Sequence, residues 1–347
     1  MRISVISFTK NGAMLADKLA KGLSTIGHIS TEYAMPRHTL AEQQPLNTTL
    51  SQWASEQFTT ADAIIFVSAC GIAVRAISPY ITDKFTDPAV VVVDETAQFA
   101  VSLLSGHVGG ANVLTQQVAG LCGAQAVVTT ATDTNKVFAV DTWAKENNCV
   151  IADKTAAKKI SAALLEGEQI GFTADFLWGK ELPNGVVEAQ EGALGFCVSL
   201  NETKKPFACT LRLIPRIITL GIGCRKGTSK AAIAKQVLAA CEGLSISPQS
   251  IKQVCSINLK ANEAGVLEYC NENNLPFVTY TAEELTAVCG EFTSSAFVKS
   301  TTGVDNVCER AAVLGSAECG GVLIATKNGE NGVTTALACD DWRINFL

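Results

Sequence analysis

The sequence predicts an α/β protein in which two α/β domains with mostly parallel sheets are joined by a smaller α+β middle segment. Short apolar runs alternate with runs of helical spacing from the first residues onward, and the same strand–turn–helix order begins again at Ile217. Between these two parts the pattern is less regular. The chain of 347 residues is long enough for two or three separate cores.

The first α/β domain is expected over residues 1–127. Its strand-like runs are short and apolar, and most are followed by a turn and then by residues with helical spacing. The expected strands cover residues 2–8, 61–69, 89–94, 98–105 and 124–133, and the expected helices cover 13–23, 72–81 and 111–123. Because strands that alternate with helices form βαβ units, we expect a mostly parallel sheet.

The middle segment, residues 128–213, is predicted to be a small α+β insert, with a linker domain as the alternative. Two runs have apolar residues at helical spacing, and four shorter runs are β-rich. The expected helices cover 139–148 and 155–168, and the expected strands cover 169–176, 185–189, 195–200 and 208–216.

The second α/β domain is expected over residues 214–347. A strand at 217–223 and a turn precede a helix at 228–241, which places Ile233, Val237, Leu238 and Cys241 on one face. The alternation continues with strands at 253–259, 276–280, 321–326 and 333–339 and helices at 262–274, 281–285 and 306–315.

Composition excludes several classes of protein. The net charge is −6 and the pI is about 5.3, so no overall attraction to nucleic acid or to an anionic membrane is expected. The longest apolar stretch is shorter than the ~20 residues that span a membrane. The 13 cysteines include no CxxC pair, so we expect no protein-bound metal, and free thiols in a reducing cytoplasm.

A glycine-rich turn surrounds one of the three histidines, in the run SGHVGGAN. Histidine titrates near neutral pH, and the backbone amides at the start of the following helix favour an anion. His107 is therefore a candidate acid or base, with Gly109 and Gly110 as amide donors to an oxyanion. Ser105, Gly106 and Asn112 complete the turn as candidate binding residues. The alternative is that His107 only holds the turn together.

A second glycine-rich turn, GIGCRKGTS, carries Arg225 and Lys226. It departs from the G-x-G-x-x-G dinucleotide pattern and has no Walker A lysine, so it predicts an anion-binding turn. Cys224 beside two cations is a candidate nucleophile with a lowered pKa. The alternative is that Cys224 is a small residue filling the turn.

Other charged residues cluster near the ends of predicted strands, the region where ligands of parallel sheets bind. Solvated surface is the default for each of them, and Lys260 and Glu263 in particular fit an exposed pair. These residues are Arg75, Lys84, Asp94, Glu95, Lys260, Glu263, Glu309 and Lys327.

Several longer motifs occur in a fixed order along the chain. The first domain contains GIAVRAISPYITDKFTDPAVVVVDETAQFAVSLLSGHVGGAN and then VVTTATDTNKVFAVD. The second contains LGIGCRKGTS, SINLKANEAG, TTGVDNVCERAA and IATKNG. Over nearly its whole length, and least clearly in the middle segment, the sequence resembles the cobalt-precorrin-5A hydrolase family of anaerobic cobalamin biosynthesis.

The resemblance implies a hydrolase whose substrate is a polycarboxylated tetrapyrrole that carries cobalt. The family opens a δ-lactone on ring A, releases acetaldehyde and yields cobalt-precorrin-5B. The cobalt belongs to the substrate, so no cofactor is implied. His107 becomes the expected acid or base, with Asp94, Glu95 and Glu263 as the next candidates. The expected carboxylate-binding cations are Arg75, Lys84, Arg225, Lys226, Lys260 and Lys327.

Two other classes of function remain open. A non-catalytic tetrapyrrole carrier of the same pathway would bind the substrate without releasing acetaldehyde. A nucleotide-using α/β enzyme would be stabilised by its nucleotide. Transient contacts with other enzymes of the pathway are expected for the hydrolase and for the carrier.

Overall fold

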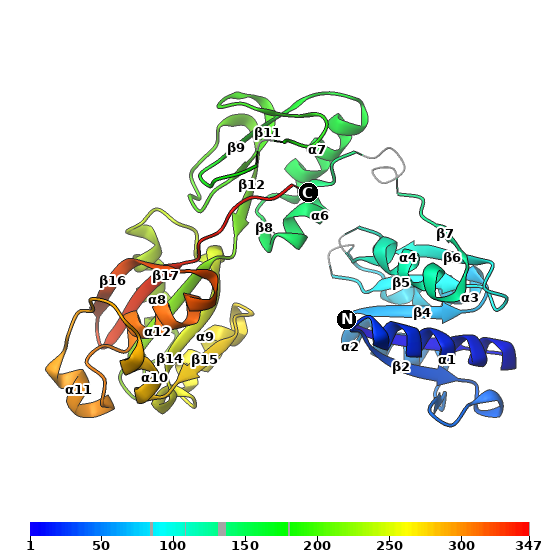
Figure 1. The fold of residues 1–347 in the computed structure, drawn as a ribbon, viewed down its shortest axis with the longest axis horizontal. Helices are drawn as coiled ribbons and strands as arrows, with labels where there is room; N and C mark the ends of the chain where they lie inside the picture. The colour runs from blue at the N-terminus through cyan, green and yellow to red at the C-terminus, as the bar shows by residue number, and fades with distance from the viewer. Residues whose placement is uncertain (84–85, 108, 131–136, 180, 347) are drawn as a thin grey trace. The chain divides into compact units, whose positions relative to one another are not determined.

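Three β-sheets with their helices make up the computed structural model of the chain (Figure 1). It describes residues 1–83, 86–107, 109–130, 137–179 and 181–346. The chain divides into two compact units, Met1–Thr142 and Trp143–Leu347. The first unit contains one sheet and the second contains two. The prediction of an α/β fold with mostly parallel sheets is confirmed, whereas the domain boundaries near residues 127 and 213 stay predictions.

The sheet of the first unit has seven strands in the order β3-β2-β1-β4-β5-β6-β7. They are β1 (Arg2–Ser7), β2 (Ile29–Ala34), β3 (Gln44–Pro45), β4 (Ala63–Val67), β5 (Ala89–Val93), β6 (Phe99–Leu104) and β7 (Gln125–Val127). All neighbouring pairs are parallel except β5 and β6. This one antiparallel pair decides where the candidate residues of the first unit lie.

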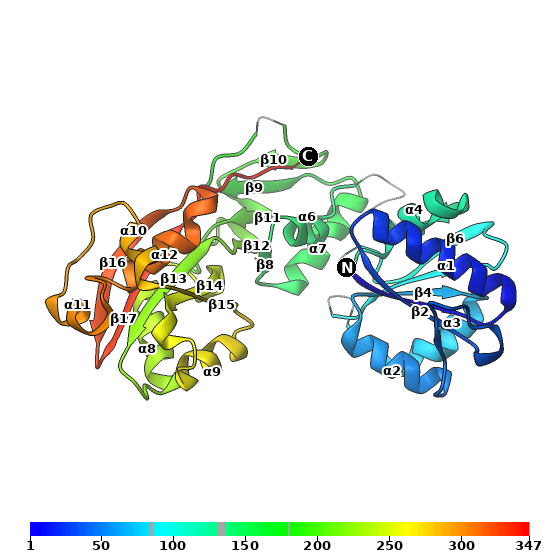
Figure 2. The ribbon, with the colours of Figure 1, turned by 60° about the horizontal axis from the view of Figure 1, so that its bottom comes forward.

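Helices cover both faces of this sheet, as Figure 2 shows. They are α1 (Lys10–Thr25), α2 (Leu50–Thr60), α3 (Cys70–Ile77) and α4 (Ala111–Cys122). One core lies between the sheet and α1 and α4, and it includes Leu19 and Leu114. The other lies against α2 and α3 and includes Trp53 and Ile77. The alternation of buried side chains along β1 and β4 therefore serves two cores, as in doubly wound folds.

The middle segment has a five-stranded sheet in the order β10-β9-β11-β12-β8. Its elements are α6 (Val140–Glu146), β8 (Cys149–Ile151), α7 (Lys154–Leu165), β9 (Ile170–Ala174), β10 (Val186–Glu188), β11 (Gly192–Val198) and β12 (Phe207–Pro215). Only the β8–β12 pair is antiparallel. The segment is therefore itself mostly parallel, which the expectation of an α+β insert did not include.

The end of the described chain returns to this middle segment. The Trp143 indole Nε1 donates to the carbonyl oxygen of Asn345 at 2.6 Å. The Phe346 ring lies 5.2 Å from the rings of both Trp143 and Phe172. Figure 1 shows this segment running from β17 back to α6. Residues far apart in the sequence thus complete one aromatic core.

The third sheet, also in the second unit, has the order β15-β14-β13-β17-β16. Its strands are β13 (Ile218–Cys224), β14 (Ile251–Ile257), β15 (Phe277–Tyr280), β16 (Val322–Glu330) and β17 (Val333–Cys339). Its helices are α8 (Lys230–Glu242), α9 (Ala264–Glu272), α10 (Ala282–Ala287), α11 (Ala296–Thr302) and α12 (Cys308–Ser316). Strands β13, β14 and β15 are parallel, and β17 is antiparallel to both β13 and β16.

Helices α8 and α9 lie on one side of this third sheet and α12 on the other (Figure 2). The packing of α12 is close, because a side chain at Gly221 of β13 would collide with the Cys308 carbonyl oxygen. Since helices lie on both faces, ligands are expected beyond the carboxyl ends of the parallel strands β13 and β14.

Within the described residues, no helix combines the length and the apolar character that crossing a bilayer requires. Twelve cysteines in this part of the chain are free thiols.

Candidate functional site

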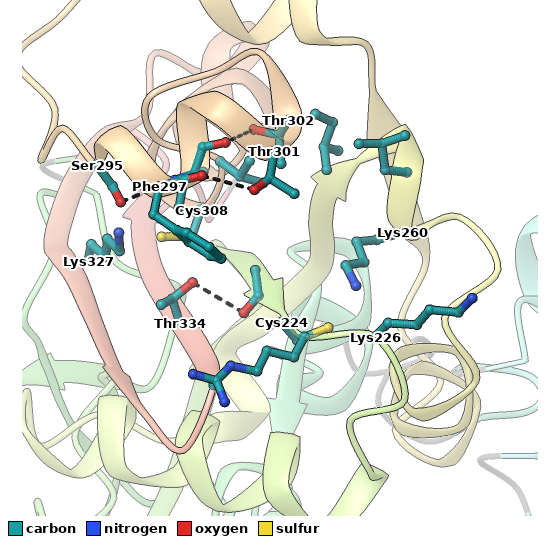
Figure 3. A pocket seen from close by; sticks show the side chains of 17 residues that line it. Cys224, Lys226, Lys260, Ser295, Phe297, Thr301, Thr302, Cys308, Lys327 and Thr334 are labelled. Atoms are coloured by element: carbon teal, nitrogen blue, oxygen red, sulfur yellow. Dashed lines mark hydrogen bonds between the residues drawn. The ribbon is translucent and has the colours of Figure 1, made fainter.

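A pocket of about 530 Å³ opens beyond the carboxyl ends of β13 and β14. One part of its lining is apolar and consists of Ile257, Leu259, Phe297, Val298 and Val307. The other part includes Cys224, Arg225, Lys226, Lys260 and Lys327. The structure therefore brings together five residues that the sequence analysis selected from three separate motifs. In Figure 3, Lys260 points toward the interior of the pocket while Lys226 extends away from it.

The basic turn is held by contacts from neighbouring elements. The Arg225 amide donates to the Gly332 carbonyl oxygen at 3.0 Å, and the Thr228 hydroxyl donates to the Arg225 carbonyl oxygen at 2.7 Å. The Gly227 amide donates to Glu263 Oε1 at 2.6 Å. These bonds fix the backbone on which the cations stand.

Lys260 and Glu263 form an ion pair with Nζ and Oε2 2.9 Å apart. Their side chains are only 17% and 8% exposed, so the expectation of a solvent-exposed pair was wrong. The hydrogen bond from Lys260 lowers the pKa of the Glu263 carboxyl, and the hydrogen bond from the Gly227 amide lowers it further. Partial burial acts in the opposite direction but has the smaller effect. Glu263 therefore positions Lys260 and the turn, and a lowered pKa makes it a weak general base.

The suggestion that Cys224 has a lowered pKa was also wrong. Burial raises the pKa of the Cys224 thiol, although the Lys260 ammonium acts in the opposite direction. A second thiol of the pocket, that of Cys308, is buried and has its pKa raised to about 11. Because the thiolate is the nucleophilic form, neither cysteine is set up as a nucleophile near neutral pH.

Helix α11 contributes pocket residues that the sequence analysis missed. Ser295, Phe297, Val298, Thr301 and Thr302 all line the pocket. Figure 3 shows the Phe297 ring extending into the space between Lys327 and Lys260. The only signal in the sequence was a run of serine and threonine around one phenylalanine. This run has no apolar residues at helical spacing, so it did not predict a helix.

The base of this α11 segment is fixed by a buried carboxylate. Glu309 has no exposed surface, so the default of solvated surface was wrong for this residue. Its Oε2 accepts from the Thr293 amide at 2.7 Å and its Oε1 accepts from the Lys327 amide at 2.6 Å. The Glu309 side chain, at the start of α12, thus connects this helix to the segment before α11 and to β16, the strand that carries Lys327.

The glycine-rich turn of the first unit follows β6. His107 Nδ1 lies 3.1 Å from the Thr142 hydroxyl, a partner that the sequence analysis did not find. Asn112 accepts from the Ser102 hydroxyl at 2.6 Å and donates to the Thr130 hydroxyl at 2.7 Å. These bonds orient the imidazole ring and connect the turn to the residues that follow β7.

Two backbone amides of this turn are used in hydrogen bonds within the turn itself. The Gly110 amide donates to the His107 carbonyl oxygen at 2.9 Å, and the Asn112 amide donates to the Gly106 carbonyl oxygen at 2.9 Å. A side chain at Gly109 would collide with Ser105, which explains why a glycine is needed there. The Gly110 amide is therefore committed to the turn, which corrects the expectation that it serves an oxyanion.

Asp94 and Glu95 lie at the other end of the sheet from His107. Strand β6 is antiparallel to β5, with Val93 opposite Ala100 and Val90 opposite Leu104. The β5–β6 turn and the His107 turn therefore lie at opposite ends of this strand pair. At about 3.3 Å per residue, the five residues of β5 separate them by roughly 16 Å. The structure does not bring these three candidate catalytic residues together.

Both carboxylates have partners of their own. Asp94 accepts from the Thr96 amide at 3.0 Å and from the Phe99 amide at 2.6 Å. Burial opposes ionisation, but the bonds from Thr96 and Phe99 prevail and lower the pKa of Asp94. Glu95 accepts from the Thr9 hydroxyl at 2.5 Å. These contacts hold the β5–β6 turn and the start of α1.

Arg75 is an exposed residue of α3 and donates to the Gly71 carbonyl oxygen at 3.2 Å. The prediction for Lys84 concerns a residue outside the part of the chain that the structure describes. Within the described part of the chain, no three His, Cys, Asp or Glu side chains are grouped so as to hold a metal ion.

Fold and pocket together define an α/β protein with a pocket that combines an apolar wall and cationic side chains, a lining that suits an organic ligand with an apolar body and an anionic edge. Three family models match the chain: "Cobalamin synthesis G N-terminal" at residues 52–133, "Cobalamin biosynthesis central region" at 138–215 and "Cobalamin synthesis G C-terminus" at 218–338. The chain belongs to the cobalt-precorrin-5A hydrolase family, and it is an enzyme of cobalamin biosynthesis of the hydrolase class.

Two relatives cover nearly the full length. The cobalt-precorrin-5A hydrolase of Salmonella typhimurium is 36% identical over 96% of this chain and 97% of its own. That of Priestia megaterium is 30% identical over 96% of this chain and 94% of its own. A solved structure described as a putative cobalamin biosynthesis protein G homolog from Sulfolobus solfataricus has a TM-score of 0.44 and 21% identity over 97% of each chain.

Proposed function

We propose that this chain hydrolyses cobalt-precorrin-5A. In the first step water adds to the carbonyl carbon of the ring A δ-lactone, and the ring oxygen leaves as a protonated alcohol, which produces a carboxylic acid. In the second step that alcohol loses its proton and the adjacent carbon–carbon bond breaks. Acetaldehyde leaves, the electron pair stays on the macrocycle carbon, and that carbon takes up a proton to give cobalt-precorrin-5B.

The observation that carries this proposal is the pocket of the third sheet. A tetrapyrrole is flat and apolar in its middle, and this substrate class bears carboxylates around its edge. The pocket combines an apolar wall with the cations Arg225, Lys260 and Lys327. Arginine and lysine form charge-assisted hydrogen bonds with carboxylates, so the pocket suits such a ring despite the acidic net charge of the chain.

The acid–base steps are assigned to His107. Lactone opening needs a base for the water and an acid for the leaving oxygen, and the carbon–carbon cleavage needs a base for the alcohol. One imidazole can serve all of these in turn. The hydrogen bond between its Nδ1 and the Thr142 hydroxyl gives the ring a defined orientation. Oriented imidazoles are the usual acid–base groups near neutral pH.

The cobalt arrives with the substrate in this proposal, and the protein needs no cofactor of its own. A cytoplasmic location is part of the proposal, because a reducing compartment would keep the many thiols of the chain free. Its partners are the substrate and, in passing, the enzymes that supply and accept it.

The test is acetaldehyde release from enzymatically prepared cobalt-precorrin-5A. Acetaldehyde is measured by NADH oxidation with added alcohol dehydrogenase, and we expect one equivalent per substrate. Tight binding without acetaldehyde would instead favour the tetrapyrrole carrier. A rise in Tm with a nucleotide, absent with the tetrapyrrole, would favour a nucleotide-using enzyme.

A further inference from the structure

Phe297 is the most unusual apolar residue of the pocket. It is 78% exposed, more than any other exposed large hydrophobic residue in the described part of the chain. It does not stand alone, because Leu259 on the same pocket is 65% exposed. Scattered exposed apolar side chains need no explanation, but two that line one cavity beside several cations indicate a binding surface.

The backbone that carries Phe297 is held in place at both ends of α11. On the side before α11, the Asn306 Nδ2 donates to the Thr293 carbonyl oxygen at 2.9 Å, and Glu309 accepts from the Thr293 amide at 2.7 Å. The Ser295 amide donates to the Asp305 carbonyl oxygen at 2.9 Å, which joins the two ends. Asn306 and Glu309 have no exposed surface.

A second set of contacts, made by Arg310 of α12, supports the same segment. Arg310 pairs with Asp305, with Nε and Oδ1 3.0 Å apart, and its guanidinium lies 4.5 Å from the centre of the Phe292 ring. Arg310 also donates to the Val288 carbonyl oxygen at 2.9 Å. The exposed ring of Phe297 is thus presented by a well-anchored backbone, which reduces the ordering that binding would cost.

We infer that Phe297 is the stacking surface for the macrocycle of the substrate: with Leu259 it contacts the apolar face of the ring, while Lys260 and Lys327 bind carboxylates at its edge. The inference rests on the proposed function for the identity of the ring. Figure 3 shows the Phe297 side chain between these two lysines. An aromatic ring stacks well on a flat conjugated ligand, whereas small carboxylates would use the lysines alone.

The experiment measures binding without turnover, with cobalt uroporphyrin III as the probe. This compound is flat, carries eight carboxylates and has no lactone. Phe297→Ala should raise the Kd of the probe by about 10- to 30-fold, the usual effect of removing an aromatic anchor. Phe297→Tyr keeps the ring and should restore the Kd to within about twofold.

A second ligand separates stacking from charge. Tricarballylate offers three carboxylates without a ring and should compete with the probe through the lysines. Its inhibition constant should be the same for the wild type and for Phe297→Ala. An equal loss for both ligands would overturn the inference, because the substitution would then act on the cations or on the fold.

Leu177→Ala is the matched control. Leu177 lies in the same unit, is 70% exposed and does not line the pocket, so its removal should leave the Kd of the probe unchanged. The Tm of Phe297→Ala should match that of the wild type, because the ring buries little surface. A fall in Tm for both Phe297→Ala and Phe297→Leu would make the ring a structural residue and overturn the inference.

The outcomes also separate the inference from the proposed function. A wild type that binds the probe through Phe297 but releases no acetaldehyde contradicts the reaction and supports the stacking role. Acetaldehyde release together with a Kd that Phe297→Ala does not change supports the reaction and contradicts the stacking role. A wild type that binds no tetrapyrrole overturns both.

Discussion

Replacing Glu309 with glutamine tests how the pocket is held together. Each carboxylate oxygen of the buried Glu309 accepts one backbone amide, from Thr293 and from Lys327. In Glu309→Gln one acceptor becomes an NH₂ group that faces an amide donor, so one charge-assisted bond is lost. Such a bond contributes about 1.5–3 kcal/mol. At about 2–4 °C per kcal/mol for a unit of this size, we expect the Tm of the second unit to fall by roughly 3–12 °C.

The same substitution should weaken ligand binding, because Thr293 leads into α11 and Lys327 lines the pocket. Thermal unfolding followed by circular dichroism gives the Tm, and titration with cobalt uroporphyrin III gives the Kd. Glu330→Gln is the control. Glu330 is an exposed residue of β16, the strand that also carries Lys327, and its replacement should change neither the Tm nor the Kd. Unfolding of Glu309→Gln at the wild-type temperature would refute the reasoning.

Three further predictions concern the chemistry. His107→Asn cannot take up a proton near neutral pH, so kcat for acetaldehyde release should fall by about 10²–10⁴ with Tm unchanged; a folded variant with wild-type kcat would exclude the acid–base role. Arg225→Ala should raise KM by the loss of about 1.5–3 kcal/mol of binding and leave kcat nearly unchanged; a lower kcat at constant KM would place Arg225 in the reaction itself. Because its raised pKa leaves less thiolate, Cys224 should react slowly with iodoacetamide at pH 7 and faster as the pH rises, followed by mass spectrometry; rapid alkylation at pH 7 would contradict a raised pKa.

Much of the fold could be predicted because its strands are short apolar runs separated by turns. The runs that became β4, β5 and β13 are nearly or fully buried, as central strands of parallel sheets are. Strand β2 and helix α2 were missed. Only two of the six residues of β2 are buried, and α2 buries a polar residue, Gln57, beside Trp53 and Ala54, so neither has a clear apolar pattern.

The direction of β6 could not be read from its composition. An antiparallel strand after a tight turn and a parallel strand after a crossover have similar apolar residues, and only the short connection from Asp94 to Gln98 distinguishes them. The consequence for the site was large. His107 and Asp94 both follow a strand in the sequence, yet the antiparallel pairing of β5 and β6 places them at opposite ends of this strand pair.

The basic side of the pocket was predictable and the apolar side was not. Arg225, Lys260 and Lys327 follow or interrupt strands, and the ends of neighbouring strands meet at one edge of a sheet. Phe297 lies in a short helix whose placement depends on Glu309, a residue that the sequence suggests is on the surface. The burial of a charged side chain depends on tertiary packing, which local sequence patterns do not contain.

The return of the chain to the middle segment means that the second unit is entered and left at one place. Trp143, its first residue, donates a hydrogen bond to Asn345 across a separation of 202 positions. Units whose ends are adjacent tolerate insertion into other proteins and circular permutation. A short glycine–serine linker between these ends, with new termini opened in the turn at Glu202 and Thr203, both exposed residues, should therefore give a permuted unit that retains the pocket. A fragment cut at residue 215 would instead leave Phe172 and Trp143 without Phe346 and expose their aromatic surface to aggregation.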